Sequence, residues 1–319
     1  MVGKSRGEKP LRAACTAFAL LLVSFVAGVA GVTGVACKRS AVVVGSKNFS
    51  EQVILGEIVA LLLEERGLTV DRRLNLGGSF ICHSAMVSGQ MDVYIEYTGT
   101  ALTAILKEPV LHDPEEVYRK VQEEYRERYG LAWGPSLGFD NTYAMAMRSE
   151  HAESLGLSRI SDLAAHVKTI RTGFGHEFLE RQDGYPGFTR AYGLDFAIPP
   201  RGMELGLIYQ ALVEERVDLI AGSSTDGLIE RFGLTVLEDD QRFFPPYYAA
   251  PVYRPETAEA HPAFREVIQM LGGAIDEPAM RSMNRAVDND RRRASDVAKE
   301  FLVDKGWISL TDDGSPPYP

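Results

Sequence analysis

The first part of the chain alternates short apolar runs with segments whose apolar residues recur every three or four positions. The short runs are rich in Val and Ile and predict buried strands, whereas the three-to-four spacing predicts helices. The elements expected in chain order are a strand over 41–45, a helix over 51–66, a strand over 69–74, a helix over 77–88 and a strand over 91–95. This strand-helix order predicts a parallel sheet with right-handed crossovers.

The pattern continues with a helix and two more strands and restarts after residue 147. Further strands are expected near 131–135, 141–147, 168–172, 194–199, 217–221, 234–237 and 249–253, and further helices near 114–129, 161–166, 184–192 and 204–216, with four helical segments closing the chain. We therefore predict two α/β lobes, each a mixed sheet flanked by helices, joined by crossing strands near Tyr143–Arg148 and Tyr247–Arg254. Lobe one would comprise residues 41–143 plus 253–319 and lobe two residues 147–246, with a ligand cleft that closes by hinge motion.

Residues 1–36 have the character of a leader. Four basic residues precede an almost wholly apolar run, which is typical of an export signal. The run is also long enough to span a bilayer, so an uncleaved anchor is the alternative. The stretch Gly34-Val35-Ala36-Cys37 resembles a lipoprotein processing site, although Leu is usual at the position of Gly34. We expect an exported protein, periplasmic or held at the cell membrane by its leader or by a lipid on Cys37.

Charge and cysteine content exclude several classes of protein function. The net charge is −10, and the part after the basic leader is more acidic still, which argues against nucleic-acid binding through phosphate neutralisation. Cys82 is the one cysteine after the leader region, so we expect no intradomain disulfide. Its neighbour His83 points in a different direction on a helix, and no second Cys-His pair exists, so we expect no metal site. We likewise expect no cofactor and no catalytic activity, because no nucleophile motif or cofactor loop is present.

Two stretches, 45–56 and 94–100, each end a predicted strand and open a helix. Open α/β sheets bind small ligands at such positions. The first stretch offers the cation Lys47 and a helix N-terminus, and the second offers the ring of Tyr97 and the hydroxyl of Thr100. This combination suggests a pocket for a small zwitterion with a carboxylate at one end and a quaternary ammonium at the other.

Seven ordered motifs resemble the osmoprotectant-binding proteins of ABC transporters, which carry glycine betaine, carnitine, choline and relatives. The motifs are Gly-Ser-Lys-Asn-Phe-Ser-Glu-Gln (45–52), Leu-Asn-Leu-Gly-Gly-Ser (74–79), Tyr-Ile-Glu-Tyr-Thr-Gly-Thr-Ala (94–101), Asn-Thr-Tyr-Ala (141–144), Asp-Gly-Tyr-Pro-Gly (183–187), Ser-Thr-Asp-Gly (224–227) and Phe-Phe-Pro-Pro-Tyr-Tyr-Ala-Ala-Pro (243–251). The resemblance covers about residues 41–306. It implies a two-lobed periplasmic-binding-protein fold of the second topological type.

In that family a box of tyrosines surrounds the trimethylammonium group, and its members map onto Tyr97, Tyr143 and Tyr247. The fourth aromatic position falls on Ser223, a departure from the family pattern. Losing one ring should cost about tenfold in affinity, unless another ring or a larger ligand fills the gap. Candidates to replace it are Tyr185, Phe188, Phe244 and Tyr248.

The family's carboxylate clamp maps onto Lys47, Thr100 and Arg181, and all three residue types fit. A carboxylate in a closed cleft needs compensating charge, because an unpaired buried anion is costly. Glu96 and Asp226 could face a ligand cation, but both adjoin expected helix starts, where the helix dipole stabilises an acid. We assign both a structural role.

The sequence therefore predicts the solute-binding protein of an ABC importer, which delivers a quaternary-ammonium osmolyte to a membrane permease. The chain has no phosphate-binding loop outside the leader, so the ATPase subunit would be separate. Two alternatives stay open. Ser223 could favour a larger trimethylammonium amino acid such as ergothioneine, or the protein could signal to a receptor instead of a permease.

Overall fold

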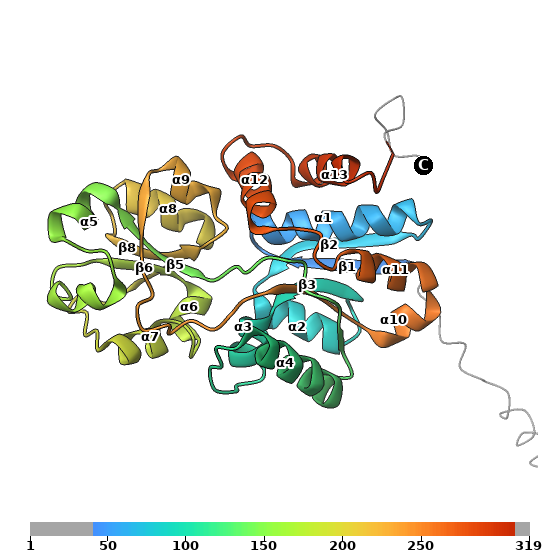
Figure 1. The fold of residues 1–319 in the computed structure, drawn as a ribbon, viewed down its shortest axis with the longest axis horizontal. Coiled ribbons are helices and arrows are strands. Elements are labelled where there is room, and N and C mark those ends of the chain that lie inside the picture. The colour runs from blue at the N-terminus through green and yellow to red at the C-terminus, as the bar shows by residue number, and fades with distance from the viewer. Residues whose placement is uncertain (1–40, 310–319) are drawn as a thin grey trace, which may run out of the picture. The chain divides into compact units, whose positions relative to one another are not determined.

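The computed structural model describes residues 41–309. Cys37 and the leader lie outside the described residues. Two five-stranded sheets, each flanked by helices, account for the described chain (Figure 1). We call the part built on the first sheet lobe one and the part built on the second sheet lobe two. The α/β class with a mixed sheet in each lobe is confirmed, whereas the residue boundaries of the lobes stay a prediction.

Lobe one contains the sheet β2-β1-β3-β10-β4. Its strands are β1 (Val42–Lys47), β2 (Val70–Gly77), β3 (Val93–Tyr97), β4 (Ala132–Trp133) and β10 (Ala249–Tyr253). β1 runs parallel to β2 and β3, as the strand-helix order predicts, and β10 runs antiparallel to β3 and β4. The helices before the crossing are α1 (Ser50–Glu65), α2 (Ser79–Val87), α3 (Thr98–Thr100) with the π-helix Ala101–Ile105, and α4 (Pro114–Tyr129).

The alternation of side chains along β1 explains how lobe one is layered. Val42 and Val44 pack in one core cluster with residues of α1 and α13, whereas Val43 packs in another with residues of α2 and α4. Successive residues of a strand point to opposite faces, so a strand covered on both sides is apolar throughout. α1 therefore covers one face of the sheet, with α13 packed on α1, and α2 and α4 cover the other face (Figure 1).

Lobe two contains the sheet β7-β6-β8-β5-β9. Its strands are β5 (Tyr143–Arg148), β6 (Thr172–Gly175), β7 (Arg201–Met203), β8 (Leu219–Ser223) and β9 (Leu234–Leu237). β6 is parallel to β7 and β8, and β5 is antiparallel to β8 and β9. The helices are α5 (Ser149–Leu155), the 3₁₀-helix Ile160–Ala165, α6 (His176–Glu180), α7 (Tyr185–Tyr192), α8 (Leu205–Val213) and α9 (Gly227–Arg231).

The strand predicted over 194–199 is wrong, and the neighbouring strand is β7, a few residues later. Leu194 and Phe196 are buried, but they pack into the core from an irregular segment. Pro199 and Pro200 cannot donate to a strand ladder, which keeps this apolar run out of the sheet. The run of apolar residues resembles a buried strand in the sequence because these side chains are buried, although the segment does not pair with a sheet.

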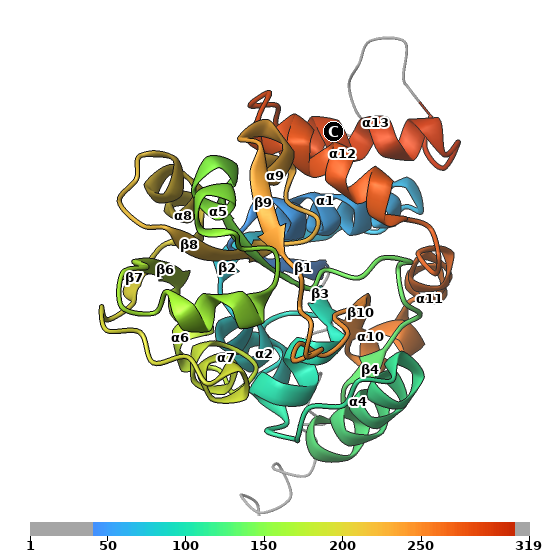
Figure 2. The ribbon, with the colours of Figure 1, turned by 60° about the vertical axis from the view of Figure 1, so that its left-hand side comes forward.

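The chain returns to lobe one through β10 and ends in the four predicted helices. They are α10 (Pro255–Ala260), α11 (Pro262–Met270), α12 (Glu277–Asp288) and α13 (Ala294–Asp304). α12 contacts α1 of lobe one and α9 of lobe two, and Figure 2 shows it beside both. Across residues 41–309, no helix is long and apolar enough to cross a membrane.

Candidate functional site

A cavity of about 460 Å³ lies where the carboxyl ends of β1, β3 and β8 meet the N-terminal ends of α1, α6 and α8. All seven ligand-site residues predicted from the sequence line it: Lys47, Tyr97, Thr100, Tyr143, Arg181, Ser223 and Tyr247. Segments of both lobes therefore contribute to one cavity, at the edge of the sheets where open α/β folds bind ligands.

Lys47 is held by a buried carboxylate of its own lobe. Its Nζ forms an ion pair with Glu96, and the two side chains are 4% and 0% exposed. Glu96 also accepts hydrogen bonds from the hydroxyl of Tyr94 at 3.1 Å and from the backbone N–H of Tyr97 at 2.7 Å. Glu96 thus neutralises Lys47, which differs from the role at a helix start that the sequence predicted for it. Lys47 Nζ also lies 4.6 Å from the centre of the Tyr97 ring.

Arg181 has a matching arrangement on the side of lobe two. Its Nε donates to Asp183 at 2.9 Å, and its Nη2 donates to the other oxygen of Asp183 and, at 3.2 Å, to Thr100 Oγ1. Burial disfavours the ionised form of Asp183, but the Arg181 charge and the hydrogen bonds from Arg181 and Tyr247 together outweigh burial and hold the pKa of Asp183 below its ordinary value. The hydroxyl of Tyr247 donates to the same carboxylate at 2.6 Å. Each predicted clamp cation therefore carries its own buried counter-ion.

The rings of the site form two groups. Tyr143 lies 5.5 Å from Tyr247 and 4.9 Å from Phe178, in edge-to-face arrangements. Tyr97 stacks on Phe49 at 6.3 Å. Offset and edge-to-face arrangements of this kind are the favoured geometries for aromatic pairs. Phe49 and Phe178 line the cavity although the sequence did not single them out.

Ser223 lies opposite Tyr143 in the β5–β8 pairing. Residues opposite each other in an antiparallel pair share a face of the sheet, so an aromatic side chain at Ser223 would lie beside the Tyr143 ring. The four candidates for the missing ring do not line the cavity. Tyr185 and Phe188 pack within lobe two. The centre of the Phe244 ring lies 5.3 Å from the centre of the Tyr143 ring. The aromatic residues that do line it besides the predicted tyrosines are Phe49, Phe178 and Tyr209.

Glu51 is the main charged group that sequence reasoning missed. It is 3% exposed and accepts hydrogen bonds from Tyr97, Asn141, Thr225 and Asn284. Burial raises the pKa of its carboxyl, and these hydrogen bonds partly oppose the rise. A signal was present, because Glu51 stands in the first turn of the helix that opens beside Lys47. Its partners, however, come from distant parts of the chain.

Glu177 joins the two lobes at the cavity. Its carboxylate accepts from the backbone N–H of Ser79 at 2.6 Å and from the Ser79 hydroxyl at 3.1 Å. Ser79 is the first residue of α2, whose N-cap Gly78 has no side chain that could cap the helix. A Cβ on Gly78 would lie 2.0 Å from Glu177 Oε1. Lobe two thus caps a helix of lobe one.

Asp226 lines the cavity beside Ser223. Its Oδ2 accepts from the hydroxyl of Tyr209 and, at 3.1 Å, from the Ser223 N–H. The side chain makes no capping hydrogen bond to α9, so its role is to anchor Tyr209 and the end of β8. Burial raises the pKa of Asp226 from 3.8 to about 7, and the two hydrogen bonds only partly oppose this.

We expect Asp226→Asn to flatten the pH dependence of stability between about pH 4 and 7. In that range folded Asp226 holds a proton that the unfolded chain has released, so the free energy of unfolding falls as pH rises. Asn can place its oxygen where Oδ2 accepts both hydrogen bonds. Because solvent reaches part of the side chain, we expect the variant to be about 1–2 kcal/mol more stable than wild type at pH 8, and equal at pH 4. Urea unfolding across this range is the measurement. Parallel profiles for the two proteins would contradict the assigned protonation.

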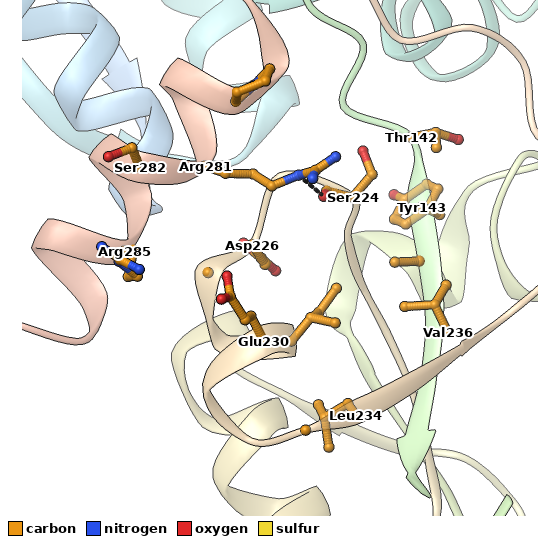
Figure 3. A pocket seen from close by; sticks show the side chains of 15 residues that line it. Thr142, Tyr143, Ser224, Asp226, Glu230, Leu234, Val236, Arg281, Ser282 and Arg285 are labelled. Atoms are coloured by element: carbon orange, nitrogen blue, oxygen red, sulfur yellow. Dashed lines mark hydrogen bonds between the residues drawn. The ribbon is translucent and has the colours of Figure 1, made fainter.

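A larger cavity of about 690 Å³ lies where α9 and β9 face α12 (Figure 3). It shares Tyr143 and Asp226 with the first cavity, but Tyr143 is the one member of the predicted set that lines it. Its arginines, Arg281 and Arg285, are exposed. Because the buried cations and the ring cluster surround the smaller cavity, that cavity is the candidate ligand site.

Comparison with known proteins identifies the family of this chain. The family of substrate-binding domains of ABC-type glycine betaine transport systems (OpuAC) matches residues 40–304. The carnitine transport binding protein OpuCC of Listeria monocytogenes is 35% identical over 269 residues, which cover 83% of this chain and 87% of that protein. The ergothioneine transport permease/ergothioneine binding protein EgtU of Helicobacter pylori is 33% identical over 268 residues, which cover 84% of this chain and 48% of that protein.

A solved crystal structure of a glycine betaine/carnitine/choline ABC transporter superposes with a TM-score of 0.68 at 36% identity, over 83% of this chain and 99% of that one. The resemblance carried by the seven motifs, and the two-lobed fold that it implies, are thereby confirmed. The chain belongs to the family of substrate-binding domains of ABC-type glycine betaine transport systems.

Proposed function

We propose that the 460 Å³ cavity binds a quaternary-ammonium osmolyte of the glycine betaine, carnitine or choline type, and that the protein delivers it to an ABC permease. The observation that carries this proposal is the convergence of two buried cations and three tyrosines on one cavity lined by both lobes. The volume lies in the range typical of small-molecule pockets.

The aromatic side of the cavity suits a quaternary ammonium group. Such a group has no N–H to donate, so π faces and negative charge must hold it, and each ring contributes about 0.5–2 kcal/mol. Tyr97, Tyr143 and Tyr247 supply the rings in this proposal. Glu177 adds an acidic group to the same lining.

The clamp side retains unused donors for a carboxylate. Within residues 41–309, Arg181 Nη1 makes no hydrogen bond, and its ion-pair partner Glu177 is 3.9 Å away. Lys47 Nζ carries three N–H groups, of which the Glu96 pair uses one. A ligand carboxylate between Lys47, Thr100 and Arg181 would therefore add hydrogen bonds without displacing Glu96 or Asp183.

A larger ligand such as ergothioneine is the second candidate. Ser223 supports it, because this small side chain faces the cavity opposite Tyr143, where the family pattern has an aromatic ring. Ergothioneine keeps the trimethylammonium and carboxylate groups that the two ends of the cavity would hold, and its ring would occupy the space beside Ser223.

A ligand panel tests the proposal. Residues 38–319 would be melted with glycine betaine, proline betaine, carnitine, choline, ergothioneine and proline. A ligand at a hundred times its dissociation constant adds about 2.7 kcal/mol, which raises the midpoint by about 5–10 °C. We expect shifts with carboxylate-bearing quaternary compounds and a smaller shift or none with choline. If none of the quaternary compounds binds even at millimolar concentration, the proposed ligand class is wrong.

The variant Ser223→Tyr separates the two candidates. If Ser223 makes room for a larger ligand, the added ring should strengthen glycine betaine binding relative to ergothioneine. Unchanged relative affinities would argue against that role for Ser223.

The proposal places the protein outside the cytoplasm, as a partner of a permease and a separate ATPase subunit. The basic and apolar leader supports export, and the sequence around Cys37 supports lipid attachment. Mass spectrometry of membrane-extracted protein would detect an acylated N-terminal Cys37. A chain that begins with the uncleaved leader would instead favour the anchor.

A further inference from the structure

The Glu51 carboxylate uses both of its oxygens to join distant parts of the chain. Oε1 accepts from the hydroxyl of Tyr97 at 2.6 Å and from Asn141 Nδ2 at 2.7 Å. Oε2 accepts from Thr225 Oγ1 at 2.6 Å and from Asn284 Nδ2 at 2.9 Å. An ionised carboxylate can only accept, so each partner must present a donor. The group is nearly fully buried, and these hydrogen bonds offset the cost of burying it.

These partners belong to different elements. Glu51 is in the first turn of α1, and Tyr97 ends β3, so both belong to lobe one. Asn141 lies on the segment that leads from lobe one into β5. Thr225 lies between β8 and α9 of lobe two, and Asn284 lies on α12. One carboxylate thus contacts a proposed ligand-cage ring, an inter-lobe connection and lobe two.

Thr225 makes two hydrogen bonds beside Glu51, one through its side chain and one through its backbone. Its hydroxyl donates to Glu51, and its carbonyl accepts from Asn284 Nδ2 at 3.0 Å. It is fully buried and does not line the ligand cavity. Movement of lobe two away from α1 would break the bond between Thr225 and Glu51, and would leave a buried carboxylate with one donor fewer.

We propose that Glu51 and Thr225 are positioning residues that set ligand affinity by holding lobe two against the Tyr97 side of the cavity. The same carboxylate orients Tyr97 through its hydroxyl and leaves the ring to face the cavity. The bond between Thr225 and Glu51 therefore favours the closed arrangement in which rings from both lobes surround a ligand. This inference rests on the proposed function for its affinity readout, but not for its effect on closure.

The variant Thr225→Val tests the pair, because it replaces the hydroxyl by a methyl group of similar size. We expect the dissociation constant of each ligand that binds to rise about tenfold. Thr225→Ser restores the hydroxyl and should recover most of the affinity. Recovery by Ser would show that the hydroxyl matters, and not merely the volume of the side chain.

Arg281→Gln is the matched control. Arg281 Nε donates to the carbonyl of Ser224 at 3.3 Å, so it holds the same loop to α12 from an exposed position that does not involve Glu51 (Figure 3). We expect its ligand affinity to stay within about twofold of wild type. A loss equal to that of Thr225→Val would mean that general loosening of the loop, and not the Glu51 bond, weakens binding.

The ligand-independent readout is the distance between the lobes. Spin labels at the exposed positions Gln90 of lobe one and Arg190 of lobe two, in the full chain, report closure without any ligand. We expect Thr225→Val to shift the distribution towards longer distances and Thr225→Ser to leave it near wild type. An unchanged distribution in Thr225→Val, or unchanged affinity, overturns the inference. Longer distances in a protein that binds no ligand of the panel would support the pair while refuting the proposed ligand class.

Discussion

Arg181→Met is expected to lower the free energy of unfolding by about 3–5 kcal/mol and to abolish binding of carboxylate-bearing ligands. Arg181 and Asp183 form a buried pair whose side chains are 4% and 0% exposed. Removing the cation leaves the Asp183 charge in a dry environment with the Tyr247 hydroxyl as its strongest remaining partner. Urea unfolding at pH 7 and calorimetric titration with the tightest ligand of the panel measure the two effects.

The double variant Arg181→Met/Asp183→Asn is the control for the stability effect. It removes both charges, so most of the lost stability should return, because the penalty comes from the unpaired charge and not from the missing guanidinium. Binding of carboxylate-bearing ligands should stay lost. If the single variant is as stable as wild type, Asp183 is not the buried counter-ion that the structure indicates.

Tyr143→Leu is expected to weaken binding of a quaternary-ammonium ligand by about 10–30-fold while leaving the fold intact. Tyr143 is the most informative ring to remove. The hydroxyls of Tyr97 and Tyr247 are bonded to Glu51 and Asp183, so changing either residue also disturbs a buried carboxylate. Within residues 41–309 the Tyr143 hydroxyl makes no hydrogen bond, and Leu can fill part of the space between Phe178 and Tyr247.

Tyr143→Phe is the matched control, because it keeps the π face and removes only the hydroxyl. Its affinity should lie within about threefold of wild type, since the ring face supplies the attraction to a cation. Calorimetric titration measures the ligand affinity of both variants, and circular dichroism checks that each is folded. Equal losses in Leu and Phe would assign the effect to the hydroxyl, and no loss in Leu would remove Tyr143 from the cage.

The β-α-β-α-β start of lobe one was predictable because each element has its own local signal. β1 is apolar on both faces since helices cover both, and the helix α1 shows three-to-four spacing and ends before Gly67. The irregular segment around Leu194 and Phe196 lacked such a signal. Its apolar residues are buried without pairing, and a pattern of hydrophobicity alone does not distinguish burial in a loop from burial in a strand.

The seven candidate ligand-site residues follow from motifs, and the structure brings them to one cavity, whereas their contact with a ligand stays a prediction. The ion-pair and hydrogen-bond partners of the groups around the cavity were not predictable from the sequence. Glu96 lies 49 positions from Lys47, Glu177 lies 98 from Ser79, and Thr225 lies 174 from Glu51. Nothing in the local sequence around either member of such a pair specifies the other.

The sequence by itself determined the α/β class, the family, and which cations and rings were candidates for the ligand, because these follow from local periodicity and from short motifs. Only the tertiary structure decided how the charges are balanced and which rings share a face. It showed that Lys47 and Arg181 each have a buried counter-ion, that Ser223 faces Tyr143, and that Glu51 joins the lobes. The physical reason is that the cost of burying a charge depends on the groups around it in space, and chain folding brings those groups from distant positions.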